Sequence, residues 1–257
     1  VAVVDTGINT KHLDLRSKLW RNPGEIAGNN RDDDRNGVID DINGFDVITG
    51  LPIEKIGDPE GHGTHVAGIV ATTSKDAEIM GIRILDENGG GSLSDAVDAF
   101  SYALLNGATV INNSWGALGV RPSQVSFLQE AIDIGERRFN AVFVAAAGNE
   151  TANTDRIPNT PSNARGMLSV GASDSLGNPA SFSNFGARTV DLFAPGVDIL
   201  SADTFSTNGR IRFSGTSMAS PVVAGAASTL QDRSPDASAA EIKAALMNGS
   251  IPQQSLQ

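Results

Sequence analysis

Three short segments of the chain supply residue types that support nucleophilic catalysis by serine. Asp5 lies in the segment VVDTG, His62 and His65 lie in HGTHVAG, and Ser217 lies in SGTSMASP. A serine hydroxyl is a poor nucleophile near neutral pH. It needs an imidazole to accept its proton and a carboxylate to orient that imidazole. The chain order Asp, His, Ser is one of the orders known to build this geometry, so the segments predict a catalytic triad.

In these motifs and their order the chain resembles the subtilases, the family of subtilisin-like serine proteases. The resemblance covers nearly the whole chain, from Val1 to about Gly249. It implies that His62 is the general base, that Asp5 orients His62, and that His65 is structural. We therefore expect a serine-type endopeptidase that works through an acyl-enzyme.

The resemblance also implies an oxyanion hole. Asn149, in the segment AAAGNE, matches the asparagine whose side-chain amide stabilises the oxyanion in this family. The backbone N–H of Ser217 is expected to be the second donor. Donors of this kind act on charge that develops only in the transition state.

A substrate groove is implied as well. The segment SWG is expected to form one wall of the pocket for the side chain before the scissile bond, and AAG the other. Small residues there leave room for a bulky substrate side chain. The segment GGG resembles the edge that pairs with the substrate backbone, with a plain flexible loop as the alternative. The expected substrate-binding residues are Gly89, Gly90, Gly91, Ser114, Trp115, Gly116, Ala146, Ala147 and Gly148.

An acidic segment, DDDRNGVIDD at residues 32–41, predicts a structural calcium site. Alternating oxygen side chains followed by glycine match the start of a calcium loop, because calcium takes six to eight oxygen ligands. The EF-hand pattern fails at its twelfth position, which is Asn43. A merely solvated acidic turn is the alternative. The expected ligands are Asp32, Asp34, Asn36, Val38 and Asp41.

Composition limits the function further. The chain has 257 residues with 40% apolar and 19% charged content, which is typical of a globular protein with one substantial core. A net charge of −11 argues against nucleic acid as a partner. There are no cysteines, so disulfides and thiolate chemistry are excluded. No apolar run reaches the ~18 residues of a membrane span.

The apolar pattern alternates between strand-like and helix-like segments, which predicts an α/β fold with a parallel sheet covered on both faces. Asp5 ends a predicted strand, Asn149 follows one, and His62 and Ser217 stand near helix starts. They are expected to converge at one sheet edge. The predicted strands are Val1–Asp5, Ile79–Leu85, Ala108–Asn112, Ala141–Ala147, Met167–Ala172 and Val190–Phe193. The predicted helices are Ser94–Asn106, Gln124–Phe139, Ser217–Leu230 and one capped by Ser238 with Glu241.

As a subtilase the chain is expected to have the three-layer αβα fold and to form one catalytic domain, residues 1–257, truncated at both ends. The implied partners are a protein or peptide substrate and the protein's own inhibitory prosegment. A monomer, secreted or held in a secretory vesicle, is expected.

Four alternatives compete with this interpretation. The first is a catalytically silent subtilase fragment that binds other chains; loss of a triad residue would favour it, and none is missing. The second is a zinc hydrolase that uses His62, His65 and either Asp58 or Glu60, but this chain lacks the usual His-Glu-x-x-His motif of zinc proteases. Within the subtilases, the intact HGTH segment argues against sedolisins. The His65-Val66 pair argues against kexin-like convertases.

Overall fold

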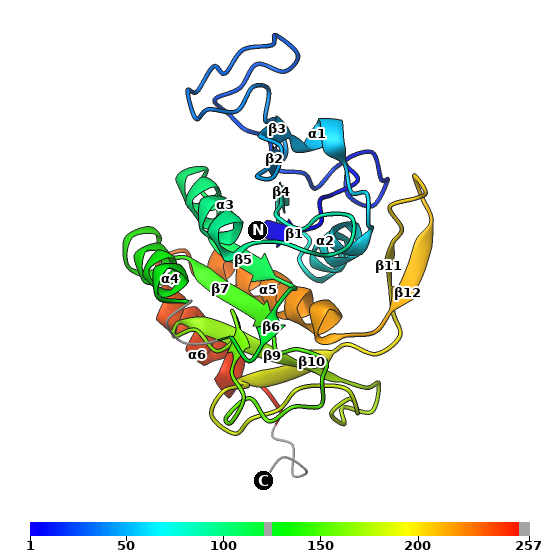
Figure 1. The fold of residues 1–257 in the computed structure, drawn as a ribbon, viewed down its shortest axis with the longest axis vertical. Helices are drawn as coiled ribbons and strands as arrows, with labels where there is room; N and C mark the ends of the chain where they lie inside the picture. The colour runs from blue at the N-terminus through cyan, green and yellow to red at the C-terminus, as the bar shows by residue number, and fades with distance from the viewer. Residues whose placement is uncertain (121–124, 252–257) are drawn as a thin grey trace.

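The computed structural model describes residues 1–120 and 125–251 and contains an eight-stranded sheet between helical layers (Figure 1). The strands follow the order β10-β9-β7-β5-β1-β4-β2-β3, and each neighbouring pair is parallel except β2 with β3. Their bounds are β1 Ala2–Asp5, β2 Gly44–Asp46, β3 Leu51–Pro52, β4 Met80–Arg83, β5 Val110–Asn113, β7 Val142–Ala146, β9 Met167–Ser173 and β10 Leu192–Pro195. The predicted α/β fold is confirmed.

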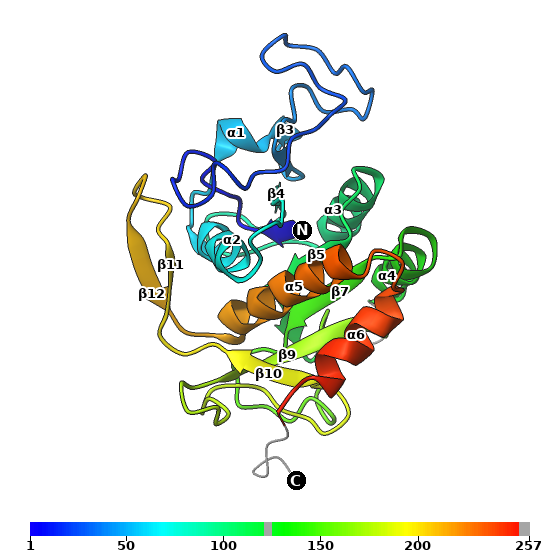
Figure 2. The ribbon, with the colours of Figure 1, turned by 180° about the vertical axis from the view of Figure 1, so that it is seen from behind.

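Helices cover both faces of this sheet, and Figure 2 shows α2, α5 and α6 on the face opposite to α3. Val4 of β1 packs in the cluster formed with α3 and α4, whereas its neighbour Val3 packs against α2. This alternation explains why the strands are apolar on both faces. No helix in the described part of the chain is long and apolar enough to cross a bilayer. The helices are α1 Ile53–Ile56, α2 His62–Thr73, α3 Leu93–Leu105, α4 Ser126–Phe139, α5 Thr216–Arg233 and α6 Ala239–Asn248.

Helix α5 passes close to α2 because its buried face is made of small residues. A Cβ placed on Gly225 would lie only 2.7 Å from Cβ of Thr73 on α2. Glycine at this position therefore lets α5 approach the C-terminal end of α2 closely.

Two small antiparallel sheets lie outside the main one. Strands β11 (Ile199–Ala202) and β12 (Arg210–Phe213) form a ribbon beside α2 (Figure 1). Strands β6 (Ala117–Leu118) and β8 (Asn159–Thr160) pair with each other. Each of these four strands is only two to four residues long, so the sequence pattern did not reveal them.

The predicted helices and strands of the main layers agree with the structure apart from their ends. The helix expected at Gln124–Phe139 spans Ser126–Phe139, and Gln124 itself lies outside the described residues. The capping box predicted before the last helix is present, with Ser238 and Glu241 each bonding the other's backbone N–H.

Candidate active site

Asp5 and His62 meet between the end of β1 and the start of α2. Nδ1 of His62 lies 2.7 Å from Oδ1 of Asp5, which also accepts the Thr6 N–H at 2.8 Å. The Asp5 side chain is fully buried, and 24% of the His62 side chain is exposed. A buried carboxylate bonded to Nδ1 sets the imidazole tautomer and leaves Nε2 to accept a proton.

The charge state of His62 reflects competing effects. Burial disfavours the imidazolium, but the adjacent Asp5 carboxylate outweighs it through charge and hydrogen bonding, with help from Glu60 and Asp58. The pKa of His62 is thereby raised from 6.5 to about 9. The site is thus arranged to stabilise a positively charged imidazole, which is the state that forms when a base has taken a proton.

Asp58 organises the start of α2, a role that sequence reasoning did not assign. Its Oδ1 accepts from Thr6 Oγ1 and Gly61 N, both at 2.8 Å. Its Oδ2 accepts from Thr64 N at 2.7 Å and Thr64 Oγ1 at 2.6 Å. Because the first N–H groups of a helix lack intrahelical partners, this buried carboxylate fastens α2 to the loop after β1. An aspartate four residues before His62 was the available signal.

Ser217 is the second residue of α5 and is joined to Ser114 by two hydrogen bonds. The Ser217 hydroxyl donates to the Ser114 carbonyl at 3.0 Å, and the Ser114 hydroxyl donates to the Ser217 carbonyl at 2.9 Å. Ser114 and His62 line the same pocket. Among the hydrogen bonds of residues 1–120 and 125–251, none joins Ser217 to His62. In this structure the Ser217 hydroxyl is bonded to Ser114 and not to His62.

Asn149 is oriented by the residue before Ser217. Its Oδ1 accepts from Thr216 N at 2.8 Å and from Thr216 Oγ1 at 3.1 Å. A backbone N–H can only donate, so the oxygen end of the amide must face Thr216. The NH₂ end is left for the cavity that Asn149 lines together with Ser217.

Gly148, just before Asn149, can only be glycine. Its φ is +103°, and a Cβ there would lie 2.2 Å from Nδ2 of Asn184. The same Asn184 amide donates to the carbonyl of Ala147 at 2.9 Å and to Oε2 of Glu150 at 2.7 Å. The turn after β7 is therefore held in one conformation.

Most of the predicted groove residues line two neighbouring pockets. One, of about 470 Å³, is lined by His62 and by the predicted residues Gly89, Gly91, Ser114, Trp115 and Gly116. The other, of about 80 Å³, is lined by Ser217, Asn149 and the predicted residues Trp115, Gly116, Ala146 and Gly148.

Two predicted groove residues do not line these pockets. Gly90 directs its N–H to Oδ1 of Asp86 at 2.9 Å and closes a turn. Ala147 is fully buried behind the wall.

His65 lies in the interior, facing away from the site. Its Nε2 is 3.1 Å from the carbonyls of both Ile199 and Ile211, and its ring stacks on Phe213 with centroids 4.5 Å apart. Burial lowers its pKa, which disfavours the charged form of the ring. The residue joins α2 to the β11–β12 ribbon.

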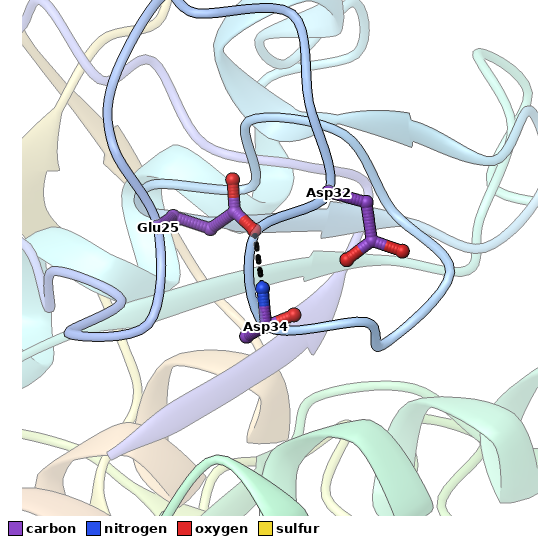
Figure 3. A group of neighbouring side chains, drawn as sticks. All are labelled: Glu25, Asp32 and Asp34. Carbon is purple, nitrogen blue, oxygen red and sulfur yellow. Dashed lines mark hydrogen bonds between the residues drawn. The ribbon is translucent and has the colours of Figure 1, made fainter.

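The acidic loop brings together Glu25, Asp32 and Asp34, each with a carboxylate oxygen within 4.8 Å of the others (Figure 3). Oε1 of Glu25 accepts the Asp34 N–H at 3.3 Å. Glu25 was missed because it precedes the Asp-rich segment, and only the folding back of the loop joins them.

The other predicted ligands take different places in this loop. Asn36 donates to Asp34 at 3.1 Å and to Asp41 at 2.8 Å. Val38 is buried and donates its N–H to the Asn36 side chain at 2.8 Å. Asp41 is fully buried and bonds Tyr102, and burial raises its pKa. Among the described residues, the group of carboxylates close enough to hold a metal ion consists of Glu25, Asp32 and Asp34, and Asp41 is not part of it.

Comparison with known proteins agrees with this fold. A family model described as the subtilase family matches residues 1–255. A thermophilic serine proteinase of Bacillus sp. (strain AK1) is 37% identical over 90% of this chain and 51% of its own length. Subtilisin DY of Bacillus licheniformis is 33% identical over 95% of this chain and 80% of its own.

Solved structures give the same result. A cold adapted subtilisin-like serine proteinase superposes with a TM-score of 0.76 at 29% identity, covering 96% of this chain and 80% of that one. A lanthipeptide protease, 24% identical, shares the fold with a TM-score of 0.80 over 98% of this chain and 80% of that one.

The chain belongs to the subtilase family, which confirms the predicted family and fold. By family it is a subtilisin-like serine endopeptidase. It spans about half the length of the Bacillus AK1 proteinase, so the substrates and partners of the whole protein are matters of proposal.

Proposed function

We propose that this protein hydrolyses peptide bonds through a triad of Asp5, His62 and Ser217. The observation that carries the proposal is the 2.7 Å hydrogen bond from His62 Nδ1 to the buried Asp5 carboxylate. It fixes the His62 imidazole in the lining of a pocket that Ser114 also lines. Ser114 in turn bonds Ser217, so all three residues belong to one connected site.

In the proposed reaction the Ser217 hydroxyl rotates from Ser114 to Nε2 of His62 and attacks the substrate carbonyl. His62 takes the hydroxyl proton and returns it to the leaving amine, which leaves an acyl group on Ser217. Water, activated by the same imidazole, then releases the acid. Asp5 stabilises the imidazolium throughout without accepting its proton.

Asn149 and the Ser217 backbone N–H are proposed to hold the oxyanion. The bond from Thr216 to Asn149 Oδ1 supports this role, because it orients the amide before substrate arrives. Pre-oriented donors stabilise a transition state without a reorganisation cost.

The substrate is proposed to lie between the 89–91 turn and the Ser114–Gly116 wall. The pocket of about 470 Å³ between them, partly lined by Leu85 and Leu93, fits apolar side chains upstream of the scissile bond. Gly91 lies at this edge of the pocket. A side chain at this position would collide with the Ile84 carbonyl, because a Cβ there would lie only 2.5 Å from it.

Calcium is proposed as a structural cofactor of the acidic loop. The donors are all carboxylate oxygens, which suit a hard cation. Asp32 already accepts N–H groups from Asn36 at 3.1 Å and Gly37 at 2.9 Å, and a carboxylate retains further lone pairs for an ion. Glu25, Asp32 and Asp34 would hold the ion, and its charge would offset their mutual repulsion.

The remaining expectations follow from family membership. We propose a monomer that acts outside the cell or in a secretory vesicle, on protein or peptide substrates. Its own prosegment would serve as inhibitor and folding aid.

A fluorophosphonate probe tests the triad directly, because it reacts only with an activated serine. The expected result is one label per chain, mapped to Ser217 and absent from Ser217→Ala. A folded, prosegment-free protein that takes no label would contradict the proposed function and favour a binding role.

A further inference from the structure

The acidic loop is joined to helix α3 by a buried hydrogen bond. The phenol of Tyr102, on α3, donates to Oδ2 of Asp41 in the loop. Asp41 is fully buried, and Tyr102 is only 8% exposed. Burial and the adjacent carboxylate raise the pKa of Tyr102, so the phenol keeps its proton and remains the donor. Hydrogen bonds to a carboxylate are among the strong ones, so this contact holds the loop against α3.

Two asparagine side chains connect Asp41 to Asp34, one of the proposed calcium ligands. Nδ2 of Asn22 donates to Asp34 Oδ2 at 2.9 Å and to Asp41 Oδ1 at 3.2 Å. Nδ2 of Asn36 donates to the same two carboxylates, at 3.1 Å and 2.8 Å. An NH₂ group has two donors, and each amide uses both of them here. A displacement of Asp34 is therefore passed to Asp41 by two separate side chains.

Helix α3 begins in the substrate groove. Its N-cap is Ser92, whose hydroxyl accepts the Asp95 N–H at 3.1 Å. Ser92 and the next residue, Leu93, line the larger pocket together with Gly89 and Gly91. A helix transmits displacement along its axis as a rigid element. A shift of α3 near its C-terminal end therefore also moves the edge of the groove.

The Tyr102 ring joins α3 to the sheet as well. It packs on Phe45 of β2, with ring centroids 5.0 Å apart. Phe45 lies opposite Ile82 of β4, and β4 leads to Leu85, which lines the same pocket. Tyr102 therefore contacts the acidic loop and the strand beside β4 from one position on α3.

We propose that Tyr102 is a positioning residue that couples the acidic loop to the substrate groove, so that a divalent cation in the loop tightens peptide binding. This inference rests on the proposed function, both for the groove and for the loop. The carboxylates of Glu25, Asp32 and Asp34 repel one another, and a cation draws them together. The bridging amides pass this difference to Asp41 and from there to α3. Tyr102 is placed to act on KM and not on kcat, because its contacts are with the loop and the sheet.

Peptide kinetics with calcium or with chelator test the coupling in the full chain. For the wild type we expect chelation to raise KM by ~2–30-fold, the range in which single residues modulate coupling between sites, with kcat little changed. Tyr102→Phe, which removes only the hydroxyl, should show a raised KM with calcium and little further change with chelator. Ser101→Ala is the control and should behave as the wild type. It removes an exposed hydroxyl of the same helix that bonds only the Val97 carbonyl.

A second readout does not depend on activity. The chain has two tryptophans, and Trp20→Phe leaves Trp115, in the groove wall, as the only one. With Ser217→Ala added, titration of a peptide followed by Trp115 emission gives its Kd. We expect this Kd to rise on chelation, and to respond little to chelation once Tyr102→Phe is added. Calorimetric titration with calcium alone measures whether the ion binds.

The outcomes separate the inference from the proposed function. A wild type that binds calcium but keeps its KM and Kd on chelation overturns the inference, as does a folded Tyr102→Phe that keeps the full calcium effect. If Tyr102→Phe does not fold, the wild-type response decides. Absence of calcium binding overturns the proposed cofactor and the inference with it. Absence of the fluorophosphonate label on Ser217 contradicts the triad alone, because the Kd measurement needs no catalysis.

Discussion

The backbone N–H of Thr216 donates to Oδ1 of Asn149 at 2.8 Å, so the first turn of α5 orients the side chain that follows β7. Ser217, the proposed nucleophile, and Asn149, the proposed oxyanion donor, are therefore positioned by one contact between two elements far apart in the sequence. A change that keeps the fold but removes the amide should affect the transition state more than substrate binding.

Asn149→Ala is expected to lower kcat by ~10²–10³-fold with little change in KM, a magnitude that comes from subtilisin itself, the reference enzyme for this donor. Steady-state kinetics on a soluble peptide measure both constants, with Asn248→Ala as the matched control. A rise in KM with unchanged kcat would instead assign Asn149 to ground-state binding.

The raised pKa of His62 predicts opposite pH effects on activity and stability. Its folded pKa is about 9 and its ordinary value is 6.5, so the ion pair with Asp5 stabilises the fold fully below pH 6.5. That contribution is lost as pH rises through about 9. Catalysis needs neutral His62, so kcat/KM should increase over the same interval.

A pH–rate profile and melting temperatures across pH 6–10 check this prediction. NMR titration of the His62 ring in the Asp5→Asn variant tests whether the Asp5 carboxylate raises the pKa of His62, because its loss should bring that pKa back toward 6.5. A His62 pKa that is the same in both proteins would show that Asp5 does not set it.

Asp58 is predicted to position His62 without touching substrate. In Asp58→Asn one of the two carboxylate oxygens that accept from the Gly61 and Thr64 N–H groups becomes an NH₂ group. Disrupting this buried network should lower the free energy of unfolding by ~1–3 kcal/mol. It should also lower kcat more than it changes KM, since α2 loses its anchor to the loop after β1.

Denaturant unfolding measures the effect of Asp58→Asn on stability, and steady-state kinetics measure its separate effects on kcat and KM. Exposed Asp236 supplies the control Asp236→Asn, which should be neutral in both. A destabilised variant with wild-type kcat would mean that Asp58 serves folding alone.

Calcium removal is predicted to lower the melting temperature through the acidic loop. An ion at 100 times its Kd stabilises a fold by ~2.7 kcal/mol, which corresponds to a shift of ~5–10 °C in a chain of this size. Calorimetry with calcium or chelator gives the shift. Asp32→Asn should abolish it, whereas Asp33→Asn, next to the group but outside it, should retain it. A wild type indifferent to calcium would leave the loop as a solvated acidic turn.

Much of the site was predictable from sequence because its signals are local. The residues flanking Asp5, His62 and Ser217 indicate where strands end and helices begin. In a parallel sheet the carboxyl ends of the strands and the helices that follow them meet at one edge. The predicted strands are continuously apolar because both faces of the sheet are buried, and the structure confirms this for β1, whose four residues are all buried. The catalytic roles of these residues remain predictions.

By itself the sequence determined the family and the layer order and pointed to the segments of the proposed triad, since each depends on short-range pattern. Only the tertiary structure decided that Glu25 joins Asp32 and Asp34, and that the Asn159 side chain packs against Gly116. Those contacts join residues that are separated in the sequence and have no periodic signature. They exist because packing and hydrogen bonding bring particular backbones together, and a one-dimensional pattern does not encode which backbones meet.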